Sequence, residues 1–131
     1  MTAELLIQEA IRAMENAYAP YSGYKVGAAL LCEDGTVYTG CNIENAAFSP
    51  TICAERTAFA KAVSDGKRAF TAVAVCGGKE GVITGFFPPC GVCRQVMKEF
   101  CKEDFLIYMV GANGTFETRT LAQLLPESFS L

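Results

Sequence analysis

The chain has 131 residues, a net charge of −3 at pH 7 and no histidine. A chain of this length suits a single domain, spanning 1–131, that buries a core without crosslinks. The lack of histidine excludes Ser-His-Asp and Cys-His catalysis, together with every metal site that needs an imidazole. The acidic balance and the scattered Lys and Arg side chains argue against a polynucleotide partner.

The N-terminal segment and the cysteines bear on where the protein works. Met1-Thr2-Ala3-Glu4 lacks the basic and apolar regions of a secretory signal, and no apolar run reaches the ~20 residues of a membrane span. Seven cysteines, an odd number, favour reduced thiols over a disulfide framework, with some of the thiols on metal. We therefore expect a cytoplasmic protein with no membrane association.

Apolar periodicity predicts a helix over about residues 3–16, followed by an aromatic loop at 18–24. The apolar run 26–31 and the segment 36–41 flank Asp34-Gly35, a pattern that predicts an antiparallel hairpin. The polar stretch Asn42-Ile43-Glu44-Asn45 follows at the strand end. On the residues alone, loop solvation is favoured there over ligand contact.

The second half of the chain alternates helices and strands. Helical spacing predicts a helix at about 54–63 and another after Cys90 with Val92, Val96, Met97 and Phe100 inward. Glycines at 77–78 predict a loop, and 82–84 a short edge segment. The remaining segments, in chain order, are strands at 70–76, 105–110 and 115–118 and a short helix at 121–125. This order predicts an α/β fold, a three-layer α/β/α arrangement with a mixed sheet of about five strands.

Two short motifs carry the chemistry: Cys53-Ala54-Glu55, and Cys90 with Cys93 in Pro-Cys-x-x-Cys. Two thiols that open a helix lie near free N–H groups and the positive end of the helix dipole, which favour thiolates. Cys53 begins the other predicted helix in the same way. Glu55 is only two positions further on, so it can face the same metal only if Cys53 lies at the junction before the helix.

Three thiols and a nearby carboxylate match a catalytic zinc site, which needs three protein ligands, an open position for water and an acid/base group. Such a site performs hydrolytic attack on an electrophilic carbon. Two alternatives remain open: a metal-free redox pair, and a structural four-cysteine site closed by one of the spare thiols. Those spare thiols are Cys32, Cys41, Cys76 and Cys101.

Nearly the whole chain resembles the cytidine deaminases, in their short, all-cysteine, homotetrameric form. The resemblance implies hydrolysis of cytidine and deoxycytidine to uridine and deoxyuridine in pyrimidine salvage, by zinc-activated water with a glutamate proton shuttle. It rests on these segments: Ala19-Pro20-Tyr21-Ser22, Val26-Gly27-Ala28-Ala29, Gly40-Cys41-Asn42-Ile43-Glu44-Asn45-Ala46, Ile52-Cys53-Ala54-Glu55-Arg56-Thr57-Ala58, Pro89-Cys90-Gly91-Val92-Cys93-Arg94-Gln95 and Leu124-Leu125-Pro126.

The resemblance also implies roles at the metal. Cys53, Cys90 and Cys93 match the ligands of one Zn²⁺ per subunit, and Glu55 matches the proton shuttle. Arg56 is expected against the cysteine ligands, where it offsets the net charge of about −1 that three thiolates give a zinc centre. An ordinary surface ion pair on the helix is the alternative for Arg56.

Further residues are implied at the substrate. Asn42 and Glu44 match residues that hold the ribose 3'-hydroxyl, which reverses the preference for loop solvation. The other matches are to aromatic or interface positions: Tyr24, usually Phe, near the base or sugar; Phe129, a C-terminal aromatic at the pocket; and Ala46 with Phe48, usually Tyr, which reach across a subunit interface. Each site in the expected homotetramer is then built from more than one chain, and its ligand is a small nucleoside.

Three other functions compete with this one. A deaminase of a cytosine-bearing antibiotic keeps both cysteine motifs but has no need of a sugar-reading pair such as Asn42 and Glu44. A polynucleotide-editing deaminase needs a basic groove, which the net charge disfavours. A non-catalytic zinc-stabilised binding module is distinguished by a fourth thiol on the metal and by no loss of function when Glu55 is changed.

Overall fold

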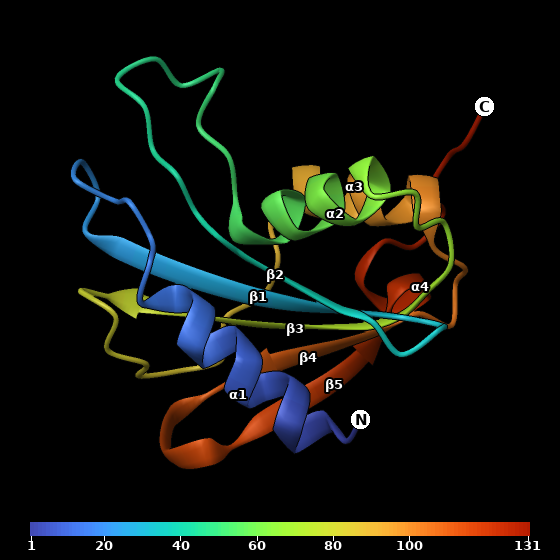
Figure 1. Cartoon of the computed structure of the whole chain (residues 1–131), viewed down its shortest axis with the longest axis horizontal. Coiled ribbons are helices and arrows are strands. Elements are labelled where there is room, and N and C mark those ends of the chain that lie inside the picture. Colours follow the sequence, from blue (N-terminus) through green and yellow to red (C-terminus); the bar gives the residue numbers. More distant parts are fainter.

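The computed structural model describes residues 1–131, and a five-stranded mixed sheet forms its centre (Figure 1). The strand order is β2-β1-β3-β4-β5, with β3 and β4 parallel and every other neighbouring pair antiparallel. The strands are β1 (Tyr24–Cys32), β2 (Val37–Cys41), β3 (Phe70–Lys79), β4 (Leu106–Val110) and β5 (Phe116–Thr120). The predicted mixed sheet and its first hairpin are therefore confirmed.

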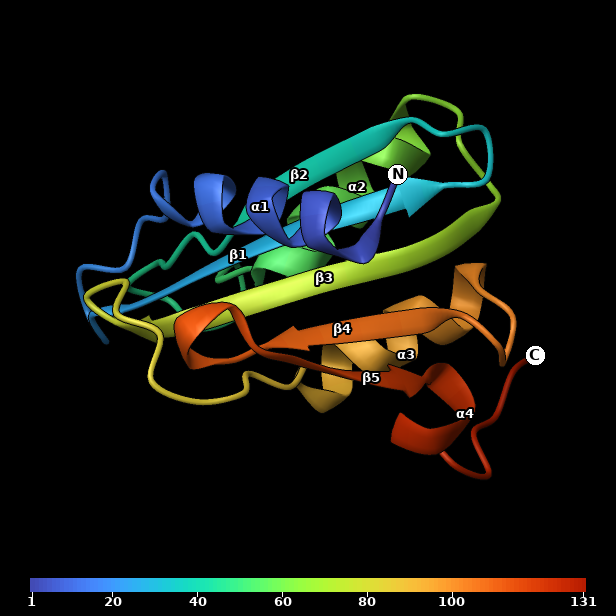
Figure 2. The same ribbon diagram turned by 90° about the horizontal axis from the view of Figure 1, so that it is seen from below.

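Helices cover both faces of this sheet, as the sequence predicts. The helix α1 (Ala3–Met14) crosses one face, while α2 (Ala54–Ser64) and α3 (Gly91–Phe100) lie side by side on the other (Figures 1 and 2). The short helix α4 (Leu121–Leu124) packs beside α3. None of these helices combines the length and the apolar composition that crossing a bilayer requires.

Two apolar clusters hold the three layers together. In β3, Val73 and Val75 face the α2 and α3 side, whereas Ala72 and Ala74 face α1. Both sets of side chains are buried, because successive side chains of a strand point to opposite faces. This double burial explains why the β3 sequence is apolar without alternation.

Glycine at position 40 lets α2 lie directly on β2. A Cβ atom at Gly40 would come within 2.4 Å of the carbonyl oxygen of Ala54, which belongs to the first turn of α2. Any larger residue would push the start of this helix away from the sheet. Gly40 thus sets the position of Cys53 and Glu55, which lie at the same end of α2.

Three local predictions are wrong. Gly77 and Gly78 belong to β3 and not to a loop, because neighbouring groups press against the strand; a Cβ at Gly77 would lie 2.9 Å from the Phe87 ring. Residues 82–84 form no strand. Val92 is 58% exposed, because the inward positions of α3 are taken by Cys93 and Met97, four residues apart on one helix face.

Candidate active site

Cys53 lies at the junction before α2. It is the N-cap residue of this helix, with the extended dihedral angles φ −79° and ψ 157°. Its side chain therefore leaves the chain before helical spacing begins, so the two-residue interval to Glu55 no longer separates the two groups onto opposite sides. This junction is the geometry that a shared site for Cys53 and Glu55 requires.

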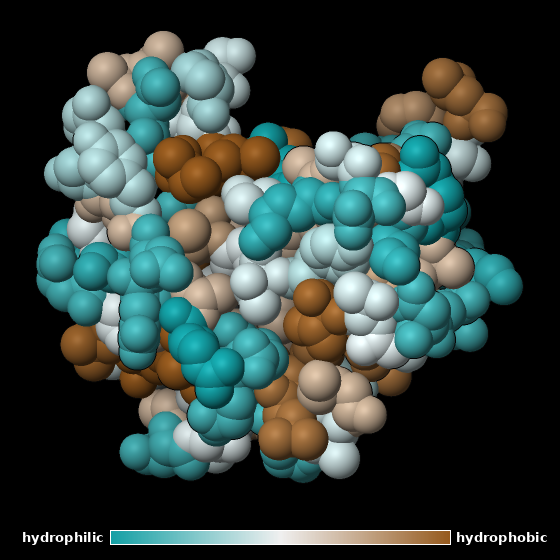
Figure 3. Space-filling model, viewed as in Figure 1, coloured by the Kyte–Doolittle hydropathy of each residue, from teal (hydrophilic) through white to brown (hydrophobic).

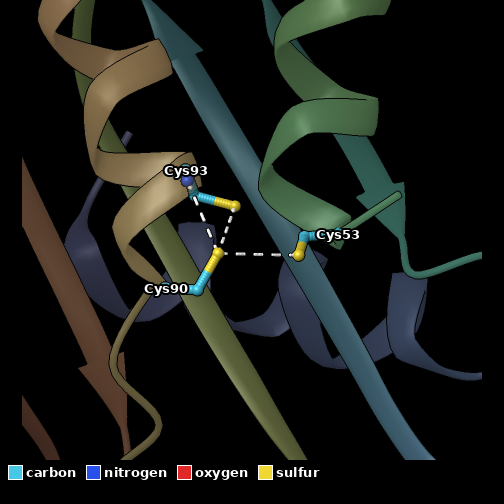
Figure 4. A group of neighbouring side chains, drawn as sticks. All are labelled: Cys53, Cys90 and Cys93. Atoms are coloured by element: carbon cyan, nitrogen blue, oxygen red, sulfur yellow. Dashed lines mark hydrogen bonds between the residues drawn. The ribbon is translucent and has the colours of Figure 1, made fainter. Parts of the chain in front are cut away.

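Cys90 begins α3 in the same manner. It is the N-cap residue of α3, and its sulfur accepts a hydrogen bond from the Cys93 N–H at 3.5 Å. Figure 4 shows the three thiols of Cys53, Cys90 and Cys93 pointing toward one another between the starts of α2 and α3. The Cys90 sulfur lies 3.7 Å from that of Cys53 and 3.4 Å from that of Cys93.

The three thiols fit one zinc ion per chain. Their sulfur atoms lie within 4.8 Å of one another, and no fourth cysteine, aspartate or glutamate joins the group. The expected four-cysteine alternative therefore has no fourth ligand here. Contact with the Cys93 thiol lowers the pKa of Cys53 to about 5, and the same contact raises the pKa of Cys93. Neighbouring thiols that cannot easily all ionise on their own are suited to bind one cation, which stabilises all of them as thiolates.

Arg56 reaches back to the metal site. One of its terminal N–H groups donates to the Cys53 sulfur at 3.4 Å, which raises the pKa of Arg56. Its Nε is buried without a hydrogen-bond partner. Arg56 forms no ion pair with a carboxylate, so its expected alternative as a surface salt bridge is excluded.

Glu55 is buried beside the thiols. Its side chain belongs to the first turn of α2 and is 2% exposed. Burial raises the pKa of this carboxyl from its usual value to about 7. A carboxyl that titrates near neutral pH is suited both to accept and to donate a proton.

A cavity of about 400 Å³ opens above this group. Cys53, Glu55 and Cys90 line it together with Asn42, Glu44 and Tyr24. The cavity thus brings both cysteine motifs together with the polar residues that follow β2. These segments lie up to 66 residues apart in the sequence, from Tyr24 to Cys90.

Asn42 is a buried side chain that bridges two strand residues. Its Oδ1 accepts from the Val26 N–H at 2.9 Å, and its Nδ2 donates to the Tyr24 carbonyl at 2.8 Å. One N–H of the amide and one acceptor position on Oδ1 are left over for a ligand. These contacts orient Asn42 without using its whole hydrogen-bonding capacity.

Glu44 is held by the loop that precedes β1. Its Oε1 accepts from the N–H groups of Tyr21 at 2.9 Å and Ser22 at 3.1 Å, and its Oε2 accepts from the Ser22 hydroxyl at 2.5 Å. The Ser22 bonds lower the pKa of Glu44 below its usual value. This carboxylate is therefore charged and held in a fixed position in the lining of the cavity.

The three remaining expected site residues do not line this cavity within one chain. Phe48 is 92% exposed and lines a second hollow with Ala46, while Phe129 is 68% exposed near the C-terminus. Figure 3 shows that the loop between β2 and α2 and the C-terminal end project from the body of the molecule. Tyr24 does reach the cavity, and its ring lies 5.5 Å from the Lys79 ammonium.

Sequence reasoning missed two supports of the site. The sequence places Ser22 in an aromatic loop, and the structure shows that its hydroxyl contacts Glu44 across 22 residues of sequence. Arg94 donates to the carbonyl oxygens of Pro89 and Leu124, each at 2.8 Å, and so ties the second cysteine motif to α4. The position of Arg94 directly after the second motif was the only available signal.

The three-layer fold, the zinc-binding thiols and the buried carboxyl define a zinc-dependent hydrolase. Residues 1–109 match the family model described as the cytidine and deoxycytidylate deaminase zinc-binding region. The chain belongs to this deaminase family.

Named relatives agree with the family. The chain is 55% identical to a cytidine deaminase of Sporosarcina psychrophila, over 99% of this chain and 93% of the relative, and 48% identical to one of Halalkalibacterium halodurans, over 99% and 96%. The crystal structure of a cytidine deaminase from Burkholderia pseudomallei superposes with a TM-score of 0.91 at 44% identity. It covers 98% of this chain and 100% of that one. The fold expected from the resemblance is thus confirmed.

Proposed function

We propose that this chain hydrolyses cytidine and deoxycytidine to uridine and deoxyuridine, with release of ammonia, in pyrimidine salvage. The observation that carries the proposal is the buried Glu55 carboxyl beside the three thiols, in a cavity that Asn42 and Glu44 also line. A metal ion beside an acid/base group can activate a water molecule for attack on an electrophilic carbon. Asn42 and Glu44 offer hydrogen-bond partners to the hydroxyl groups of a sugar.

Cys53, Cys90 and Cys93 would hold the zinc ion. When bound, zinc supplies the Lewis-acid activation of water that hydrolysis of a stable amidine carbon needs. The Arg56 guanidinium lies on the Cys53 sulfur and withdraws negative charge from the ligand set. Without this cation, three thiolates would lessen the activation that the metal provides.

Glu55 moves the protons. As a carboxylate it takes a proton from the attacking water and delivers it to N3 of the cytosine ring. The second water proton leaves with the 4-amino group, so the products are a uracil ring with a carbonyl at C4 and ammonia. A pKa of about 7 lets the same side chain act first as base and then as acid.

Asn42 and Glu44 hold the 3'-hydroxyl of the sugar. The unused groups on Asn42 can both donate and accept, and Glu44 can accept from a hydroxyl proton. Tyr24 borders the same cavity and supplies an aromatic face beside the base or sugar. The cavity thus has a reacting end and a recognition end.

The assembly completes the cavity. We propose a cytoplasmic homotetramer in which Ala46, Phe48 and Phe129 contribute to the site of a neighbouring copy, each copy being one domain over 1–131. The exposed rings of Phe48 and Phe129 on the two projecting segments support this proposal, because contact with a neighbouring copy would remove their apolar surface from water. An active species that sediments as a monomer would contradict it.

The direct test uses purified, zinc-loaded protein. On addition of protein, the ultraviolet absorbance of cytidine is expected to change to that of uridine, with one ammonia released for each nucleoside consumed. Deoxycytidine is expected to react as well. If neither nucleoside changes while the protein is folded and holds zinc, the proposed function is wrong.

A further inference from the structure

The loop at residues 19–24 leaves Glu44 with a single free acceptor position. A carboxylate offers about four acceptor positions on its two oxygens. On Glu44, two are taken on Oε1 by the N–H groups of Tyr21 and Ser22, and one is taken on Oε2 by the Ser22 hydroxyl. The remaining position is therefore on Oε2.

The hydroxyl of Ser22 is itself oriented by the backbone. It accepts a hydrogen bond from the Tyr24 N–H at 3.0 Å. Because a serine hydroxyl has one proton and Tyr24 occupies its acceptor side, that proton is directed to Glu44. The hydrogen bonds therefore run in one direction, from the Tyr24 N–H to the Ser22 hydroxyl and from that hydroxyl to Glu44. Ser22 and Glu44 both line the main cavity.

The loop has anchors that do not depend on this hydroxyl. The Lys79 ammonium donates to the Ser22 carbonyl at 2.9 Å, and the Glu80 N–H donates to the Gly23 carbonyl at 2.6 Å. The Gly23 N–H also donates to the Ala19 carbonyl at 3.0 Å. Removal of the Ser22 hydroxyl therefore leaves the loop tied to the end of β3.

We propose that Ser22 is a positioning residue for sugar recognition. Its hydroxyl holds Glu44 so that the one free acceptor position on Oε2 receives a single sugar hydroxyl. This inference rests on the proposed function, in which Glu44 binds the 3'-hydroxyl. A carboxylate with one position left cannot bind two neighbouring hydroxyls together, so Glu44 does not read the 2'-hydroxyl.

The experiment compares Ser22→Ala with Ser22→Thr on three substrates: cytidine, deoxycytidine and 3'-deoxycytidine. Ser64→Ala is the matched control, because Ser64 is exposed at the end of α2. Because the lost bond positions Glu44 and is not itself made to the substrate, we expect KM to rise roughly three- to tenfold, about the contribution of one ordinary hydrogen bond. This rise applies equally to cytidine and deoxycytidine, while kcat stays near the parent value.

The third substrate separates positioning from a general structural effect. With 3'-deoxycytidine, Ser22→Ala is expected to match the parent protein, and Ser22→Thr is expected to restore the parent KM for cytidine. An equal KM increase on all three substrates, or no increase on any, would overturn the inference. A larger increase for cytidine than for deoxycytidine would also overturn it, because Glu44 would then read the 2'-hydroxyl. A parent protein inactive on cytidine would instead refute the proposed function.

Discussion

The floor of the cavity and the outer segments of the chain are built in different ways. The floor consists of Cys53, Cys90 and Glu55, which line the cavity, and of Cys93, whose sulfur contacts that of Cys90; all four lie at the starts of two helices that pack on the sheet. The outer segments are the loop after β2, where Phe48 is 92% exposed, and the C-terminal end, where Phe129 is 68% exposed, and neither ring lines the cavity. A single chain therefore brings the three thiols and the Glu55 carboxyl together, whereas it leaves the rings of Phe48 and Phe129 exposed.

The largest effect is expected from removal of one of the metal-binding thiols of the floor. Cys90→Ala removes one of three metal-binding thiols and the sulfur that accepts the Cys93 N–H. We expect zinc to fall from one per chain to well below that value, with loss of measurable turnover, since two thiols bind zinc much less tightly than three. Elemental analysis of dialysed protein measures the zinc.

Cys101→Ala is the matched control for this change. Cys101 is partly buried at the end of α3, outside the group of three thiols, and its burial raises its pKa to about 12. This variant is expected to keep its zinc. If Cys90→Ala also retained a full complement of zinc, the assignment of the ligand set would be wrong.

The next largest effect is expected when the positive charge beside the metal-binding thiols is removed. Arg56→Gln removes the guanidinium that donates to the Cys53 sulfur. We expect zinc to remain bound, turnover to fall roughly 10- to 100-fold, and the acidic limb of the pH–rate profile to move to higher pH. Arg12→Gln, on the exposed face of α1, is the control. Unchanged turnover together with an unmoved limb would leave Arg56 without a catalytic effect.

A smaller effect on activity is expected from a change at Glu44, which lines the cavity. Glu44→Gln keeps the shape of the side chain but removes its charge, so we expect KM for cytidine to rise roughly tenfold. The preference for cytidine over 3'-deoxycytidine should weaken in parallel. Glu15→Gln, in an exposed position after α1, is the control. A Glu44→Gln variant that still prefers cytidine by the parent margin would show that Glu44 does not bind the sugar.

The sequence predicts those parts of the fold and of the site that depend on residues close together in the chain. The sequence predicts β1 and β3 because burial on both faces leaves continuous apolar runs, and it predicts the metal ligands because two helix starts carry them within short motifs. The contact between Ser22 and Glu44 could not be predicted from spacing, because it joins two loops. Gly77 was misassigned because its neighbour Phe87 comes ten positions later in the sequence.

The smallest effect concerns pH. Because the Ser22 bonds lower the pKa of Glu44 below the ordinary 4.5, the carboxylate stays charged as the pH falls through that value. Its contribution to sugar binding and to stability is therefore present at neutral pH and is lost only below the ordinary range. We expect the ratio of KM values for cytidine and 3'-deoxycytidine to be constant between pH 7 and about pH 5. A ratio that changes already near pH 6 would contradict this.

In the proposed mechanism, the buried Glu55 carboxyl transfers the protons of hydrolysis. The most direct test of this role measures zinc content and cytidine turnover on the same samples of the parent protein and Glu55→Gln. The amide fills the same space but cannot transfer protons, so we predict one zinc per chain in both proteins and a turnover roughly 10²- to 10⁴-fold lower in the variant. Near-parent turnover in a folded, zinc-loaded Glu55→Gln protein would show that Glu55 does not transfer the protons.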